Sequence, residues 1–109
     1  MRLRHVQDEI AMLSEATRGT TAEAFAASYV LRRTTEHALL IISEAVRALP
    51  QDLLARHPGP RWQEIRGIGN VLRHDYFAVD TAVLWAILTE DIPGLATVID
   101  AMIADVTDS

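Results

Sequence analysis

The sequence predicts an all-α fold, a bundle of four or five main helices that forms one domain over residues 1–109. Several long segments repeat apolar residues at spacings of three and four, the pattern of an amphipathic helix, and no stretch shows sustained period-two alternation. Half of the residues are hydrophobic but only 6% are aromatic. This balance suits packed helices better than a sandwich of short strands.

The first half of the chain predicts three helical segments. The first is an amphipathic helix that should end near Gly19, and its apolar side is formed by Leu3, Val6, Ile10, Leu13 and Thr17. Thr20 followed by Glu23 matches a capping box and predicts a short helical turn. Residues 28–49 then form one long helix. Its second half is apolar around most of its circumference, so we expect it to be buried.

The second half predicts a further turn and three helices. Pro50 should end the long helix, and the turn that follows stops at a Pro/Gly break over residues 58–60. Trp62 opens the next helix, Asp80 is a suitable N-cap for another, and Asp91 with Pro93 should start the last. Several faces are broadly apolar in a chain this short. We therefore expect a homodimer, with a compact monomer as the alternative.

Charge and composition restrict the class of function. The formal net charge of -5 argues against a protein that coats nucleic acid through a basic surface, although a small basic site is compatible with it. The absence of cysteine removes thiolate chemistry and fits a reducing compartment. No run of about 18 apolar residues and no signal peptide are evident, so we expect a cytoplasmic protein without a membrane span.

The chemically richest stretch is the predicted helix that Trp62 opens. At about 100° per residue, one arc of its surface collects polar side chains that could hold a phosphate beside a titratable imidazole. We call these residues the polar arc: Gln63, Arg66, Asn70, Arg73 and His74. Phe77 falls within the same arc. An ordinary solvated helix face would give the same pattern, and geometry alone does not separate the two interpretations.

Two glycines lie inside this helix, and each costs about 1 kcal/mol relative to alanine. Gly67 and Gly69 therefore indicate a requirement of packing. Either another helix approaches closely at this point, or the helix is kinked there.

The long buried helix also carries ionisable groups on one side. Arg33, His37 and Glu44 lie within about 60° of one another on its surface. They form either an internal network that holds the helices in register or part of a cleft with a direct role. No metal-ligand pattern and no glycine-rich phosphate loop is present, so we expect no metal and no cofactor, and any chemistry should be metal-independent acid–base chemistry.

The string IRGIGNVLRHDYFAVD, preceded by PRWQEI and followed by VLWAILTEDIPGL, resembles the HepT-like proteins of the HEPN superfamily, the toxin half of a bacterial toxin–antitoxin pair. The resemblance spans residues 3–103 and is most specific at Asn70, His74 and Tyr76. It implies an all-α homodimer that cleaves RNA without a metal. It also implies His74 as the catalytic histidine, Asn70 as its neighbour, and Tyr76 as the tyrosine to which the partner antitoxin, a minimal nucleotidyltransferase, adds AMP.

The resemblance implies the family pattern Arg-x4-6-His, usually Arg-Asn-x-x-x-His-x-Tyr. The sequence departs from it at one position, because Gly69 stands where the arginine is expected. Three explanations are open: a natural loss of activity, a deliberate inactivation, or replacement by Arg66 or Arg73. We prefer a neighbouring arginine. We also expect Gly69→Arg to raise RNA cleavage and growth inhibition.

Metal-free cleavage needs an acid and a base, and the predicted helix that Trp62 opens has one histidine. We therefore expect two copies of His74 to meet at a dimer cleft that takes single-stranded RNA. The alternative is a catalytically impaired HEPN protein that serves as a helical binding or scaffolding partner of a nucleotidyltransferase. A helical dimer without any ligand is a third interpretation.

Overall fold

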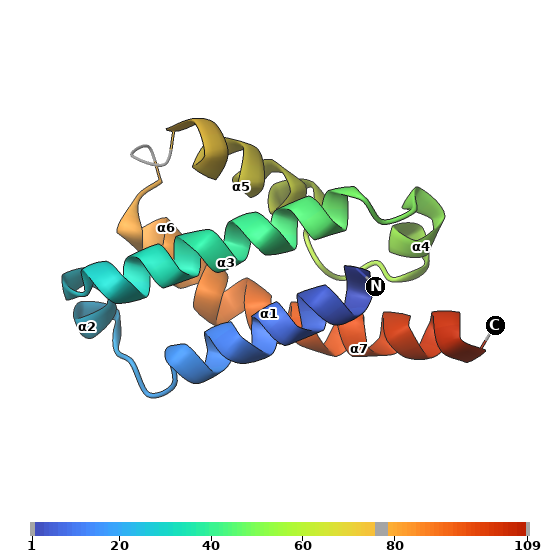
Figure 1. The fold of residues 1–109 in the computed structure, drawn as a ribbon, viewed down its shortest axis with the longest axis horizontal. Coiled ribbons are helices and arrows are strands. Elements are labelled where there is room, and N and C mark those ends of the chain that lie inside the picture. The colour runs from blue at the N-terminus through green and yellow to red at the C-terminus, as the bar shows by residue number, and fades with distance from the viewer. Residues whose placement is uncertain (1, 76–78, 109) are drawn as a thin grey trace.

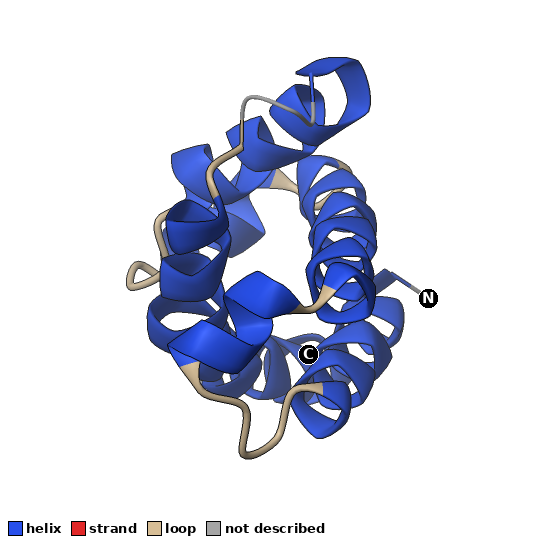
Figure 2. Ribbon diagram, turned by 90° about the vertical axis from the view of Figure 1, so that its left-hand side faces the viewer, coloured by secondary structure: helices blue, strands red, loops and turns tan. Residues whose placement is uncertain are grey.

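The computed structural model describes residues 2–75 and 79–108, and all regular structure in these residues is helical (Figure 2). The elements are α1 (Arg2–Ala16), α2 (Ala22–Ala27), α3 (Tyr29–Arg47), α4 (Gln51–Arg56), α5 (Trp62–Asp75), α6 (Thr81–Ala86), a π-helical turn (Ile87–Asp91) and α7 (Ile92–Asp108). The predicted all-α bundle is confirmed.

The long helix α3 lies at the centre of the packing. It runs beside α5 on one side and α1 on the other, and α7 packs on α1 along the opposite edge (Figure 1). The core is built from the apolar sides of these helices. Val6, Phe25, Val46, Ile99 and Met102 have no exposed surface. The prediction that α3 is buried holds for Ala38, Leu39, Ile42, Ala45 and Val46.

Side chains cap three helices close to where the sequence predicts. Ser28 Oγ accepts from the Leu31 amide at 3.1 Å, and Asp80 Oδ1 accepts from the Ala82 amide at 2.8 Å. The capping box at Thr20 is wrong by one residue, because Thr21 Oγ1 accepts from the Ala24 amide at 3.1 Å. A hydroxyl caps the amide three residues on, so two adjacent threonines give patterns that the sequence alone does not distinguish.

The expected helix start at Asp91 and Pro93 is also wrong. The helix continues unbroken from Thr81 to Thr107 because the turn Ile87–Asp91 widens to π geometry, in which the Ile92 amide reaches the Ile87 carbonyl. A proline lacks the amide for an α-helical bond, and this wider turn just before Pro93 accommodates it without a break.

The continuous helix from Thr81 to Thr107 is both long and apolar. Residues 81–107 are long and apolar enough to cross a membrane by those two criteria, with a mean hydropathy of 1.5 in the best window. The sequence analysis expected one helix to end and another to start at Asp91, so it did not recognise a single helix of this length. One side of the helix nevertheless packs on the other helices through Leu84, Leu88, Leu95 and Ile99, as the core helix of a soluble bundle does.

A cluster of ionisable groups joins α4 to α7 near the C-terminal end of the bundle. Asp105 Oδ2 lies 3.1 Å from His57 Nε2 and 3.2 Å from Arg56 Nε. The hydrogen bond from His57 is the chief reason that the pKa of the Asp105 carboxyl is lowered, and the Arg56 contacts act in the same direction. The Trp62 indole donates to the His57 carbonyl at 3.1 Å and extends this cluster to α5.

The cluster predicts a pH-dependent contribution to stability. A carboxyl group with a depressed pKa contributes to the stability of the fold above its unfolded-state pKa. This contribution is lost as the pH falls through the lower folded-state pKa. Asp105→Asn should therefore lower the melting temperature at pH 7, and its difference from the parent should shrink below about pH 4. Asp8→Asn, at an exposed position of α1, is the matched control. An Asp105 variant with a pH-independent deficit would contradict this linkage.

Candidate active site

A close approach between α3 and α5 positions the polar arc. Ser43 is completely buried, and its hydroxyl donates to the Arg66 carbonyl and accepts from the Gly69 amide, both at 3.1 Å. A Cβ built on Gly69 would lie 2.6 Å from the Ser43 Cβ and closer still to its hydroxyl oxygen. Of the two structural reasons for a glycine here, helix–helix contact is the one that the structure supports.

This contact bears on the expectation that arginine at position 69 would raise cleavage. The Cα of Gly69 faces α3, so an arginine there could not enter without separating the two helices. Restoring the family arginine should therefore not raise activity. The close packing of α3 and α5 is therefore a physical reason for a glycine at this position.

The polar arc lies on the part of α5 that faces away from the core. Gln63, Asn70, Arg73 and His74 are exposed, and Arg66 is half-buried. On the opposite side Leu72 is buried, which confirms the amphipathic division predicted for this helix. The imidazole of His74 is accessible near the C-terminal end of α5.

The two candidate substitute arginines differ in their contacts. Arg73 pairs with Glu44 of α3, a pair in which both side chains are about half exposed. Exposed pairs contribute about 0–1 kcal/mol, so a bound anion could displace Glu44 at small cost. Arg66 has no ion-pair partner among the described residues, and its half-buried position limits the motion of its stem. Arg66 is thus free to bind an anion without breaking an existing contact.

The ionisable groups of α3 lie at the surface of the single chain. His37 and Glu44 are exposed and Arg33 is half-exposed, so the expected internal position is not observed. Arg33 donates to Glu36 at 2.7 Å, which is the main reason that the pKa of its guanidinium is raised, and it also lies over the Tyr29 ring. A cavity of about 340 Å³ opens beside them, lined by Arg33, Glu36, His37, Leu40 and Leu72.

These groups and the polar arc occupy neighbouring helices. Glu44 contacts Arg73 directly, and Leu72 of α5 forms part of the lining of the cavity beside His37. The predicted modification residue Tyr76, and Phe77 with it, lie outside the described residues. No group of three or more metal-ligating side chains occurs in the described ranges.

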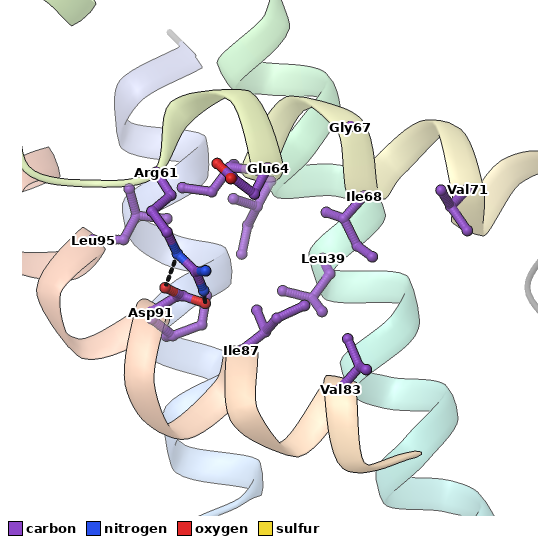
Figure 3. A pocket seen from close by; sticks show the side chains of 13 residues that line it. Leu39, Arg61, Glu64, Gly67, Ile68, Val71, Val83, Ile87, Asp91 and Leu95 are labelled. Atoms are coloured by element: carbon purple, nitrogen blue, oxygen red, sulfur yellow. Dashed lines mark hydrogen bonds and ion pairs between the residues drawn. The ribbon is translucent and has the colours of Figure 1, made fainter. Parts of the chain in front are cut away.

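The other side of α5 borders a cavity that the sequence analysis missed. It measures about 400 Å³ and is almost entirely apolar, with walls from α5, α6 and the π-helical turn and a floor from α3 (Figure 3). At one end Arg61 bridges to Asp91 through contacts of 2.6 and 3.2 Å. The sequence signal for this cavity was the apolar spacing of Ile65, Ile68 and Val71. Such spacing does not distinguish a helix face that is packed against another helix from one that borders a cavity.

The protein is thus a small all-α bundle in which α5 carries an exposed set of arginine, amide and imidazole side chains, the polar arc. The family model described as "Ribonuclease HepT-like" matches residues 6–102. The chain therefore belongs to the HepT-like family.

Individual relatives agree with this assignment. The chain is 36% identical to a "putative RNase" of Caldanaerobacter subterraneus subsp. tengcongensis, over 85% of this chain and 83% of the relative. It is also 36% identical to a "probable ribonuclease HepT" of Thermococcus cleftensis, over 85% and 84%, and 35% identical to a "putative RNase" of Methanocaldococcus jannaschii, over 72% of each. No solved structure gives a significant match.

Proposed function

We propose that this protein is a metal-independent endoribonuclease that cleaves single-stranded RNA at a homodimer cleft. The observation that carries the proposal is the exposed row of Arg66, Asn70, Arg73 and His74 on one helix of a HepT-like chain. These residues provide guanidinium and amide donors for a phosphate and one imidazole for proton transfer. The names of the relatives point to the same class of substrate.

The reaction is an internal displacement at phosphorus. One His74 takes the proton of the ribose 2′-hydroxyl, whose oxygen then bonds to the phosphorus as the bond to the 5′-oxygen breaks. His74 of the second protomer gives a proton to that leaving oxygen. The products are a 2′,3′-cyclic phosphate and a 5′-hydroxyl end. Arg73, next to His74 in the sequence, stabilises the charge that develops on the non-bridging oxygens. Arg66, about 12 Å from His74 along α5, binds an adjoining phosphate of the strand.

A face of α3 supports dimerisation next to this site. Tyr29 and Val30 are 64% and 68% exposed, large values for such side chains, and they share a helix face with Arg33, His37 and Glu44. Apolar surface mixed with a few charged groups is typical of interfaces between folded subunits. Pairing through the α3–α5 face would bring the two polar arcs together.

The direct test is cleavage of a labelled single-stranded RNA by purified protein in the presence of EDTA. We expect fragments with cyclic phosphate ends, and an oligomeric state of two by light scattering. Intact RNA under these conditions would favour the alternative, a catalytically impaired scaffold for a nucleotidyltransferase. A Cβ at position 69 would overlap Ser43, so close packing is a reason for the glycine that does not require an impaired site.

The HepT resemblance extends the proposal to a cytoplasmic toxin that a minimal nucleotidyltransferase antitoxin neutralises. AMP added to Tyr76 would place an anion two residues from His74 and oppose RNA by charge and bulk. Co-expression with such a partner should therefore add one or more AMP groups at Tyr76, detected by peptide mass spectrometry, and relieve growth inhibition. Tyr76→Phe should remain unmodified and toxic in the presence of the partner. Neutralisation of the Tyr76→Phe protein without any modification would contradict this route.

A further inference from the structure

A third cavity lies at the start of α5, at the other end of the polar arc from His74. It measures about 350 Å³, within the range of small-molecule sites but near its lower limit. One wall comes from α4, the rim from the loop at residues 58–60, and the other wall from Trp62, Gln63 and Arg66. Gln63 and Arg66 thus belong both to this cavity and to the polar arc.

The charge of the lining distinguishes this cavity from the other two. The apolar cavity has Arg61, Glu64 and Asp91 at its edge, and the cavity beside His37 has Arg33 with Glu36. In the cavity at the start of α5, Arg66 is the one charged residue of the lining. An anionic ligand therefore meets no carboxylate there, in a protein whose net charge is -5.

The remaining side chains match the two ways in which proteins hold an unpaired base. Trp62 offers an indole whose position is fixed, since its N–H donates to the His57 carbonyl. Aromatic side chains of this kind stack on bases of single-stranded RNA. The exposed Gln63 carries both a donor and an acceptor in one amide, the combination that reads a base edge.

The helix sets the distance to the reacting phosphate. Arg66 and His74 are eight residues apart on α5, which is about 12 Å along the axis. A short run of single-stranded RNA covers this distance, and Arg66 lies between the cavity and Asn70.

We propose that the cavity lined by Trp62, Gln63 and Arg66 binds a nucleobase of the RNA that is a short run of nucleotides away from the scissile phosphate, and sets a base preference at that position. The inference rests on the proposed ribonuclease function and assigns it a specificity subsite. Trp62 stacks on the base, the Gln63 amide bonds its edge, and Arg66 binds the phosphate that follows.

The first test measures binding at Trp62 directly. Trp85→Phe leaves Trp62 as the single tryptophan, so its fluorescence reports on the cavity. Titration with the four nucleoside 5′-monophosphates should quench this fluorescence, with different affinities for different bases. Gln63→Ala should weaken the preferred one by about three- to tenfold, the effect of one lost hydrogen bond. Gly67→Ala, with open space on the same helix, is the control and should leave binding unchanged.

The second test uses cleavage and separates the two hypotheses. The parent should cut a mixed-sequence RNA with a base preference on one side of the bond. Gln63→Ala should relax this preference, and so should Gln51→Ala, which removes the second amide of the cavity lining, on the α4 wall. A parent protein that cuts no RNA would overturn the proposed function. A parent that cuts RNA, with the same base preference in both variants and no Trp62 quenching, would overturn the subsite alone.

Discussion

Replacement of His74 by alanine is expected to abolish RNA cleavage and growth inhibition while RNA binding persists. The imidazole is the one side chain of the polar arc suited to general acid–base catalysis, whereas Arg66, Arg73 and Asn70 can bind RNA without it. General acid–base catalysis contributes about 10²–10⁴-fold for each group, and the variant loses both groups of the dimer. The measurements are fragment yield on a labelled single-stranded RNA and fluorescence polarisation of the same RNA.

His5→Ala is the matched control, because His5 is also an exposed helical histidine but lies on α1. It should leave cleavage unchanged. A His74→Ala protein as active and as toxic as the parent would contradict the mechanism.

The requirement for two histidines can be tested separately with mixed dimers. If one protomer supplies the base and its partner the acid, a dimer with one His74→Ala subunit is inactive. After exchange of subunits, activity should then fall as the square of the parent fraction. A linear fall would mean that each His74 works alone, and the shared cleft would be wrong even though His74 is essential.

The fold was predictable because its signals are local and repeated. Apolar spacing gave the extents of α1, α3 and α5, and short polar side chains gave the starts of α3 and α6 at Ser28 and Asp80. The errors arose where two local choices are nearly equal. Thr20 and Thr21 are both able to cap α2, and Pro93 is compatible with either a break or a π-helical turn.

The exposure of the candidate site residues was predictable, but their contacts were not. Periodicity placed Asn70, Arg73 and His74 on one exposed face, and the structure agrees. It could not reveal that Arg73 pairs with Glu44 or that Arg66 borders a cavity with Trp62, because both contacts join segments that are distant in sequence.

Gly69→Arg and Gly69→Ala are expected to destabilise the protein, and neither should raise cleavage by the folded fraction. A Cβ at this position overlaps Ser43, whose own Cβ is fixed on α3 and cannot rotate away. Overpacking of this kind costs about 1–3 kcal/mol, more than the helix propensity that alanine would add. Urea unfolding should show the loss as a lower midpoint with an unchanged slope.

Two further variants make this prediction specific to the contact between α3 and α5. Gly67→Ala, two residues away with nothing within 4 Å of its Cβ, should stabilise the same helix by up to about 1 kcal/mol. Ser43→Gly removes both overlapping atoms, so Gly69→Ala should cost much less in that background than in the parent, a coupling that a double-mutant cycle measures. Equal costs in the two backgrounds would mean that Ser43 does not explain the glycine. Higher cleavage by stable Gly69→Arg protein would instead restore the view that an arginine has been lost at this position.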